Sequence, residues 1–341
     1  MQSWLRRLAS LKFTLVGMVL LGLGAAASYG NPVDVSVWVL IVPLALLALN
    51  LSAAIATNPR INRQPGLLLF HVCLLCTVIL AGVGRLTHLD AHLEIAEDQA
   101  FSPNLLLEVK RGPWHRGNLD KVAFTQGRYT VEYAPHMKRG LTHSTVYLPA
   151  PDGRLTPRDV GDDRPLILHR YRFYTTHNKG FAPVLTWIPN QGEAVTGRIN
   201  MPSYPMFDYK QDNHWTPPGT HQEIKFWLQL HTALDVEKSW VLDGRNSTAT
   251  LVVTVGDRRE ELEKGQELQL ADGRLRYENL TTWMGYRVFY DPTIQWLFWV
   301  TIAGVLGLTH FFWTKLNLVP WMDADDGATV TTTDTTPGEK A

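Results

Sequence analysis

Four long stretches of the chain are apolar and almost free of charge, and polar segments separate them. They lie at about residues 13–33, 35–58, 65–85 and 292–314. A helix of about 20 apolar residues is long enough to cross the hydrocarbon core of a bilayer. The pattern therefore predicts a membrane protein with four transmembrane α-helices, three of them N-terminal and one C-terminal.

The segment between the third and fourth stretches, residues 86–291, has a different pattern. Short alternating or aromatic-rich runs recur in it, and several are separated by Asp-Gly or Lys-Gly turn signals. The runs lie at 128–133, 166–175, 223–230, 248–255, 274–277 and 286–290. This spacing predicts a large, mainly β domain with sandwich-like or barrel-like sheets. Residues 201–219 are rich in Pro, Tyr and Asn, and we expect a long loop there.

The charges beside the apolar stretches predict how the chain is oriented. Residues 1–12 carry Arg6, Arg7 and Lys12 without an acid, the 57–65 loop carries Arg60 and Arg63, and the loop at 31–34 has no basic residue. Basic loops favour the cytoplasmic side. The 86–291 domain is then extracytoplasmic, and the acidic, Thr-rich tail at 315–341 is a disordered cytoplasmic segment.

The N-terminus also fits a second interpretation. A basic start followed by an apolar run and Ala25–Ala27 is typical of a signal peptide with a small-residue cleavage site. Because more apolar stretches follow closely, a retained first membrane helix explains the pattern better.

Composition adds little that is functional. The chain has 341 residues and a formal net charge of zero, which gives no reason to expect nucleic acid as a partner. Its two cysteines, Cys73 and Cys76, both lie in the third apolar stretch. The predicted outer domain has no cysteine, so no disulfide holds it and its hydrophobic core must suffice.

The most informative residue is His71, in the third apolar stretch. Counted from Pro65, it lies six residues into the predicted helix, which is about 9 Å from the cytoplasmic end. An ionisable residue in a membrane span is costly and marks a candidate functional site. His71 could hydrogen-bond a neighbouring helix, or it could be an axial ligand of haem iron in apolar surroundings.

Other candidate ligands are weaker. Cys73 and Cys76 form a CxxC, but a threonine follows, so the covalent haem signature C-x-x-C-H is absent and small packing residues are the simpler interpretation. His88 and His92 would face one way if the third helix continued past them, as a pair of metal ligands would, but solvated interfacial residues are the simpler interpretation. His310, in the fourth span, is a second candidate haem-facing histidine unless it reaches to the interface.

Four pieces of the chain resemble the ResB family of cytochrome c biogenesis proteins. The Met284–Pro292 stretch is the most specific. The pieces are Leu8–Lys12; Phe70–Val72 with Gly82–Arg85 and Leu93–Ile95; Arg164–Leu166 with Tyr171–Tyr174; and Met284–Pro292. The chain departs from the family at Thr293, where glycine is usual, at Thr175, where glutamine is common, and in its cysteine-free outer domain.

The resemblance implies a function. Family members act with a CcsA/ResC-type membrane protein, which carries a Trp-rich WWD motif absent here, to move haem across the bacterial cytoplasmic (inner) membrane and present it to apocytochrome c. A thioredoxin-like reductant supplies reduced thiols indirectly. The resemblance implies that His71 binds b-type haem non-covalently and transiently, and that the chain is a non-catalytic subunit of the synthase.

Two other functions fit the same pattern. One is a membrane-anchored β domain that scaffolds assembly of a respiratory complex and binds no haem. The other is a receptor for an outside ligand, although the short acidic tail leaves no room for a signalling domain.

Overall fold

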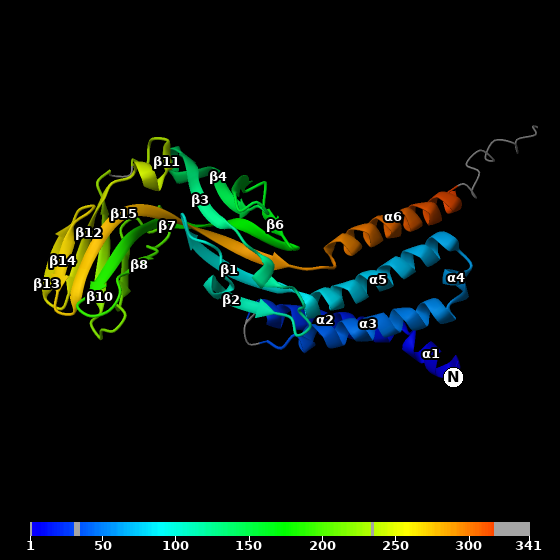
Figure 1. Cartoon of the computed structure of the whole chain (residues 1–341). Helices are drawn as coiled ribbons and strands as arrows, with labels where there is room; N and C mark the ends of the chain where they lie inside the picture. Colours follow the sequence, from blue (N-terminus) through cyan, green and yellow to red (C-terminus); the bar gives the residue numbers. More distant parts are fainter. Residues whose placement is uncertain (1, 31–34, 233–234, 317–341) are drawn as a thin grey trace, which may run out of the picture. The chain divides into compact units, whose positions relative to one another are not determined.

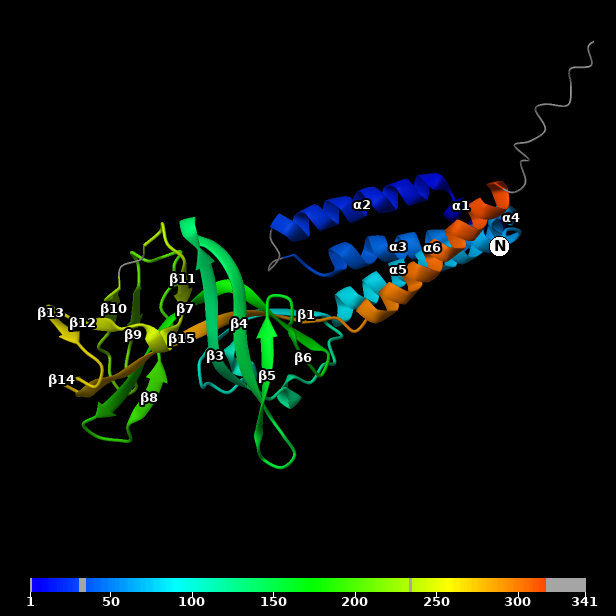
Figure 2. The ribbon, with the colours of Figure 1, turned by 90° about the horizontal axis from the view of Figure 1, so that it is seen from above.

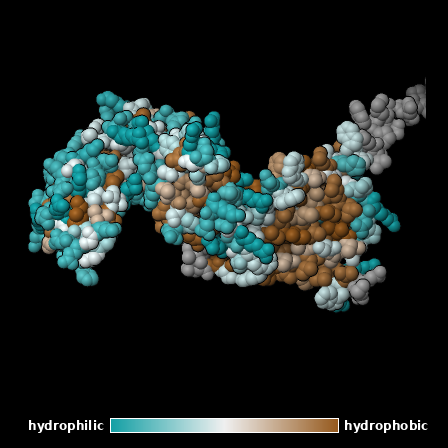
Figure 3. All heavy atoms as spheres, in the orientation of Figure 1, coloured by the Kyte–Doolittle hydropathy of each residue, from teal (hydrophilic) through white to brown (hydrophobic). Residues whose placement is uncertain are grey.

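The computed structural model describes residues 2–30, 35–232 and 235–316. It divides into a helical unit, residues 1–85 with 293 onward, and a β unit, Leu86–Pro292. The predicted outer loop at 31–34 lies outside the described residues, as does the predicted disordered tail from residue 317 onward. Figure 3 shows hydrophobic residues gathered over the helical unit, whereas the surface of the β unit is largely hydrophilic.

The four long apolar helices are confirmed, and each is long and apolar enough to cross a membrane. They are α2 (Leu11–Gly30), α3 (Trp38–Thr57), α5 (Pro65–Thr87) and α6 (Ile294–Leu316). Two short helices, α1 (Gln2–Leu8) and α4 (Pro59–Asn62), were not predicted. Helix α4 begins with a proline that needs no N–H partner, and the Asn58 side chain accepts a hydrogen bond from Arg60 N. The predicted 57–65 loop therefore contains a capped helical turn.

Helix α3 is fastened to the start of the chain through one buried polar side chain. Asn50 Nδ2 donates to the carbonyl oxygens of Leu8 and Ser10, and its Oδ1 accepts from Thr14 at 2.7 Å. Asn50 is buried, and a buried side-chain amide without hydrogen bonds would cost free energy among apolar helices. These bonds remove that cost. The contacts fix the α1–α2 corner against α3.

Helices α5 and α6 cross closely where both carry glycine. A Cβ atom built on Gly66 would lie 2.6 Å from the carbonyl oxygen of Gly307, and one built on Gly304 would lie 3.2 Å from Cys73 Cβ. Small residues let two helix backbones approach in this way. The packing of α5 on α6 therefore depends on these glycines, and Figure 1 shows α5 between α3 and α6.

The β unit is mainly strand, as predicted, and its described residues form three sheets. Its strands are β1 (Leu89–Ala96), β2 (Leu106–Arg111), β3 (Thr125–Ala134), β4 (Lys138–Pro149), β5 (Leu155–Gly161), β6 (Leu166–Leu168), β7 (Tyr171–Pro189), β8 (Val195–Arg198), β9 (Asp212–Trp215), β10 (Ile224–Leu230), β11 (Trp240–Leu242), β12 (Ala249–Val255), β13 (Arg258–Leu262), β14 (Glu267–Leu270) and β15 (Gly273–Tyr290). Short 3-10 turns are η1 (Pro103–Leu105), η2 (Leu119–Lys121), η3 (Pro135–Met137) and η4 (Gly244–Asn246). The long loop expected at 201–219 is interrupted by β9, which pairs with β10.

Two strands organise the whole unit. β7, with 19 residues, pairs with β15, with 18, from Tyr171↔Tyr290 at one end to Pro189↔Gly273 at the other. At the first end β6 joins β7, while β1 and β2 continue beyond β15; at the other end β8 joins β7 and β14 joins β15. The β7–β15 ribbon thus runs through both halves of the unit.

Each half of the ribbon is accompanied by one four-stranded sheet. The sheet β11-β3-β4-β5 lies with the β6/β1/β2 half, and β13-β12-β10-β9 lies with the β8/β14 half (Figures 1 and 2). Alternation explains the packing: Ile224, Phe226 and Leu228 of β10 are buried, whereas Lys225 and Trp227 are exposed. Together the sheets share one hydrophobic core.

Candidate functional site

His71 lies on the second turn of α5, and its ring is held by its own helix. Nδ1 is 2.8 Å from the carbonyl oxygen of Leu67, and the Phe70 ring packs edge-on with ring centroids 5.5 Å apart. A carbonyl oxygen can only accept, so Nδ1 carries the proton. In the neutral ring Nε2 then has a free lone pair. This is the arrangement typical of histidines that bind metal through Nε2, whose other nitrogen donates to a backbone carbonyl.

The face of α5 that carries His71 is not the face that contacts α6. Contacts with α6 come from Gly66, Leu69, Phe70 and Cys73. At 3.6 residues per turn, the five residues from Gly66 to His71 turn the side chain by about 140° around the helix. His71 therefore shares its face with Leu75 and Val78, and the ring is half-buried among apolar residues.

His310 lies against α5 at a different place. Its Nδ1 is 2.9 Å from the position that a Cβ atom on Gly66 would occupy, and the residue is exposed overall. Because Gly66 and His71 point in directions about 140° apart, the structure does not bring the two histidines to one face of α5. His310 is thus no partner for His71 on a shared face.

The expectation that His88 and His92 share one face of a continuing helix is wrong. Helix α5 ends at Thr87 and β1 begins at Leu89. At about 3.3 Å per residue, an extended chain separates the two histidines by about 13 Å, too far to share one metal ion. His92 Nδ1 instead lies 3.3 Å from Glu108 Oε2 on β2. In the described part of the chain no three His, Cys, Asp or Glu side chains are grouped to hold a metal.

Cys73 and Cys76 are both free thiols in α5. Cys73 is buried against Gly304 of α6, and Cys76 is half-buried. These positions fit the interpretation of the CxxC as small packing residues.

One histidine that the sequence did not single out joins three segments of the β unit. His115 Nδ1 is 2.8 Å from the carbonyl oxygen of Thr87, and its Nε2 is 2.9 Å from the hydroxyl of Tyr171. The ring also packs edge-on against Tyr290, with centroids 4.8 Å apart. Because Nδ1 must donate to the carbonyl, Nε2 accepts from the tyrosine. No motif surrounds His115, so only the tertiary structure identifies this contact.

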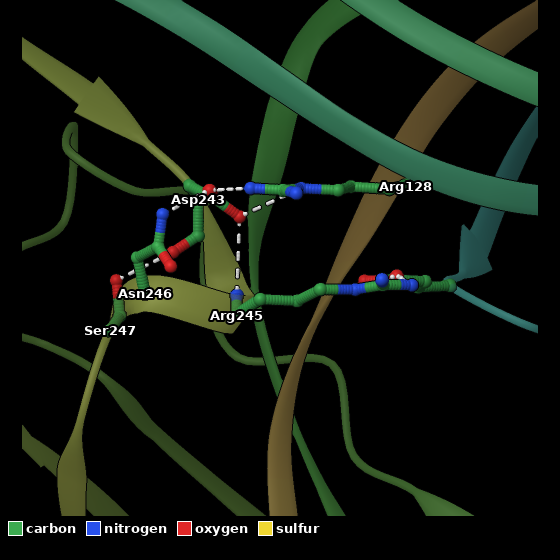
Figure 4. Close-up of polar contacts among 6 residues, drawn as sticks. Arg128, Asp243, Arg245, Asn246 and Ser247 are labelled. Carbon is green, nitrogen blue, oxygen red and sulfur yellow. Dashed lines mark hydrogen bonds and ion pairs between the residues drawn. The ribbon is translucent and has the colours of Figure 1, made fainter.

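A second polar cluster lies where β11 turns into β12 (Figure 4). The Arg128 guanidinium pairs with both carboxylate oxygens of Asp243, and the Asp243 side chain also accepts from Arg245 N and Asn246 Nδ2. Arg245 pairs in turn with Glu97. Asp243 and Glu97 are buried and each has an arginine partner, so neither carboxylate is an unpaired reactive group.

Lys179, on β7, is the most strongly perturbed base in the β unit. Burial first, and then the charge of Arg139, lower the pKa of Lys179 to about 7, while the charge of Asp162 acts in the opposite direction. Its exposed fraction is 1%, and Nζ donates to Thr142 Oγ1 at 2.7 Å. A neutral amine could act as a base or nucleophile, but one sealed from solvent has no access to a substrate.

Comparison with known protein families finds no family model that matches the chain. Comparison with curated proteins finds no match. The chemistry of His71 therefore rests on its own geometry: one imidazole nitrogen with a free lone pair, in an apolar helix, held in one tautomer.

Proposed function

We propose that the chain is a multi-pass protein of the bacterial cytoplasmic (inner) membrane, crossing it with α2, α3, α5 and α6. The basic residues before α2 and around α4 support a cytoplasmic location for those segments. The β unit then faces the periplasm or cell exterior. A reporter joined after residue 85 tests this: it should function outside the cytoplasm, and one that functions only inside contradicts the orientation.

We further propose that the protein acts in cytochrome c biogenesis as a haem-handling subunit beside a CcsA/ResC-type partner. The observation that carries the proposal is the His71 ring, whose Nδ1–H is committed to Leu67 O while Nε2 has no hydrogen-bond partner among the described residues. The resemblance to the ResB family supports it, because the position of His71 matches the family's implicated haem ligand. The apocytochrome c client and the thiol reductant would act on the outer side.

The residues around His71 fit a bound haem. Iron accepts a neutral imidazole as axial ligand, and apolar side chains suit the porphyrin. His71 would supply Nε2, while Leu75 and Val78 on the same face would contact the ring. Bound haem supplies the iron and the vinyl groups that become attached to cytochrome c. This chain's contribution is to bind and orient it, because no acid, base or nucleophile lies on this face of α5.

The alternative role of His71, a hydrogen bond between helices, is less favoured. In the described residues the hydrogen bond of the ring stays within α5, since its partner is the Leu67 carbonyl four residues earlier. That bond orients the ring without linking two helices. The geometry therefore favours a role for the second nitrogen, Nε2, over a hydrogen bond between helices.

The test is the haem spectrum of the purified chain with a co-expressed CcsA-like partner. We expect His71→Ala to lose most of the haem absorbance while the complex still co-purifies, and added imidazole to restore it. His310→Ala is the matched control, because it removes a histidine from another apolar helix and should keep its haem.

Unchanged haem in His71→Ala, with an intact complex, would contradict the ligand role. A chain that keeps the complex assembled without any haem of its own would favour the scaffold function instead.

A further inference from the structure

The loop that follows β2, residues 112–117, is tied to residues 86–88, at and just beyond the end of α5, by three hydrogen bonds, and a fourth lies within the loop itself. Gly112 N donates to the carbonyl oxygen of His88 at 2.9 Å, and Trp114 N donates to that of Leu86 at 2.8 Å. His115 N donates to Gly112 O at 3.0 Å, and His115 Nδ1 donates to Thr87 O at 2.8 Å. The loop therefore has a fixed position beside the last turn of α5.

The loop is also fixed from its other side. His115 Nε2 accepts from the Tyr171 hydroxyl, and a Cβ atom on Gly117 would collide with that same oxygen, so glycine fits best there. The loop is thus clamped between α5 and the start of β7, and the position of its exposed side chains is set by the fold.

The exposed side chains of this loop are of a particular kind. Trp114 is 55% exposed, although tryptophan is usually buried, and Arg111 and Arg116 on either side of it are exposed as well. Leu107 and Val109 of the neighbouring strand β2 are 47% and 44% exposed. An amphipathic indole between two cations, beside apolar side chains, suits the boundary between lipid tails and phosphate headgroups.

The length of α5 indicates that its last turn reaches the boundary between lipid tails and phosphate headgroups. Its 23 residues span about 35 Å at 1.5 Å each, slightly more than the hydrocarbon thickness of about 30 Å. The last turn, Leu86 and Thr87, then reaches the headgroup region, and Trp114 is hydrogen-bonded to that turn.

We propose that residues 111–116 form a lipid-binding surface that rests on the outer leaflet, with the Trp114 indole among the headgroups and Arg111 and Arg116 facing lipid phosphates. The proposal rests on the membrane insertion proposed above, and it is independent of haem.

Spin-label accessibility tests the proposal in full-length protein in phosphatidylcholine–phosphatidylglycerol vesicles. Cys73→Ser/Cys76→Ser removes both native cysteines, and single cysteines are then introduced by Trp114→Cys, Trp227→Cys or Ile79→Cys. Trp227, on β10 in the other half of the β unit, is the matched exposed tryptophan, and Ile79, exposed in the middle of α5, is the depth standard. Label at 114 should be at least three-fold less accessible to a water-soluble nickel complex than label at 227, and more accessible to oxygen.

Comparison of the labels at positions 79, 114 and 227 distinguishes a lipid-binding surface from the alternatives. If label at 79 reports the bilayer interior while label at 114 is as open to nickel as label at 227, the lipid-binding surface is wrong and membrane insertion stands. If label at 79 is open to nickel too, the membrane insertion itself is wrong. Low accessibility to both nickel and oxygen at 114 would indicate cover by protein, which also overturns the proposal.

Discussion

Lys179 Nζ lies 2.7 Å from Thr142 Oγ1, joining the middle of β7 to β4 in a place closed to water. The partner is an uncharged hydroxyl, while Arg139, itself paired with Asp162, lies close enough to repel a positive charge. A neutral amine therefore suits this position better than an ammonium ion does.

The first prediction concerns pH. Burial lowers the pKa of Lys179 to about 7 in the folded protein, whereas the ordinary value is 10.5. Between these values the unfolded chain binds a proton that the folded chain does not, so the free energy of unfolding rises with pH, by at most about 1.4 kcal/mol per pH unit. Below pH 7 both states are protonated and the full cost of the buried charge is present. We expect Lys179→Met to remove this rise between pH 7 and 9.

Urea unfolding of the detergent-solubilised chain, followed by tryptophan fluorescence, measures this slope. Lys225→Met is the control, because Lys225 is exposed on β10 and its removal should leave the pH dependence unchanged. Parallel pH profiles for wild type and Lys179→Met would show that Lys179 is charged in the folded state.

The second prediction tests the crossing of α5 and α6. A Cβ atom at position 304 would lie 3.2 Å from Cys73 Cβ, close to the separation of about 3.8 Å that a disulfide requires. Gly304→Cys in a Cys76→Ser background should therefore form a disulfide with Cys73 under mild oxidation in the membrane. Val305→Cys, one residue on and exposed, should remain reduced.

The chain is cut by a protease within the β unit, and the fragments are separated on a non-reducing gel. A disulfide keeps the fragment that contains α5 joined to the fragment that contains α6, which changes the gel mobility. Equal cross-linking from positions 304 and 305 would mean that α5 and α6 do not pack through their glycines.

The third prediction concerns the ion pair between Glu97 and Arg245. The Glu97 side chain is 4% exposed and that of Arg245 is 56% exposed. Arg245→Met leaves a buried carboxylate with Thr281 Oγ1, at 3.3 Å, as its remaining side-chain partner. We expect a loss of about 2 kcal/mol, below the 3–5 kcal/mol of fully buried pairs because Arg245 is half in water.

The double variant Glu97→Gln/Arg245→Met distinguishes pairing from packing. It should be more stable than Arg245→Met alone, since no unpaired charge stays buried. Additive losses in the unfolding free energies would mean that the two side chains act independently.

The sequence was sufficient to predict the structural features that depend only on residues adjacent in the chain. A charge-free run of 20 residues is a local property, so the four helices were predicted within a few residues of their ends. The position of His71 on α5 followed from the same pattern. The direction in which the His71 side chain points could not be predicted. It depends on the close approach of Gly66 to Gly307, and these two residues lie far apart in the chain.

Two wrong or missed predictions can be traced to the local sequence, and a third feature could not be predicted from it. His88 and His92 were considered as part of a continuing helix, yet the alternation of Leu89, Ala91 and Leu93 with polar residues indicates the strand β1. Strand β9 was missed because Asp212–Trp215 has no apolar alternation. The Glu97–Arg245 pair spans 148 residues, and no local pattern could predict it.

The β7–β15 ribbon has a consequence for how the chain is made. Every residue between Pro189 and Gly273 is synthesised after β7 and before its main partner, and β15 is followed almost at once by α6. Until β15 emerges, β7 lacks the strand with which it pairs over nearly its whole length. The β unit thus completes its longest strand pairing only after β15 has been synthesised, so closure of the ribbon comes just before α6 is made.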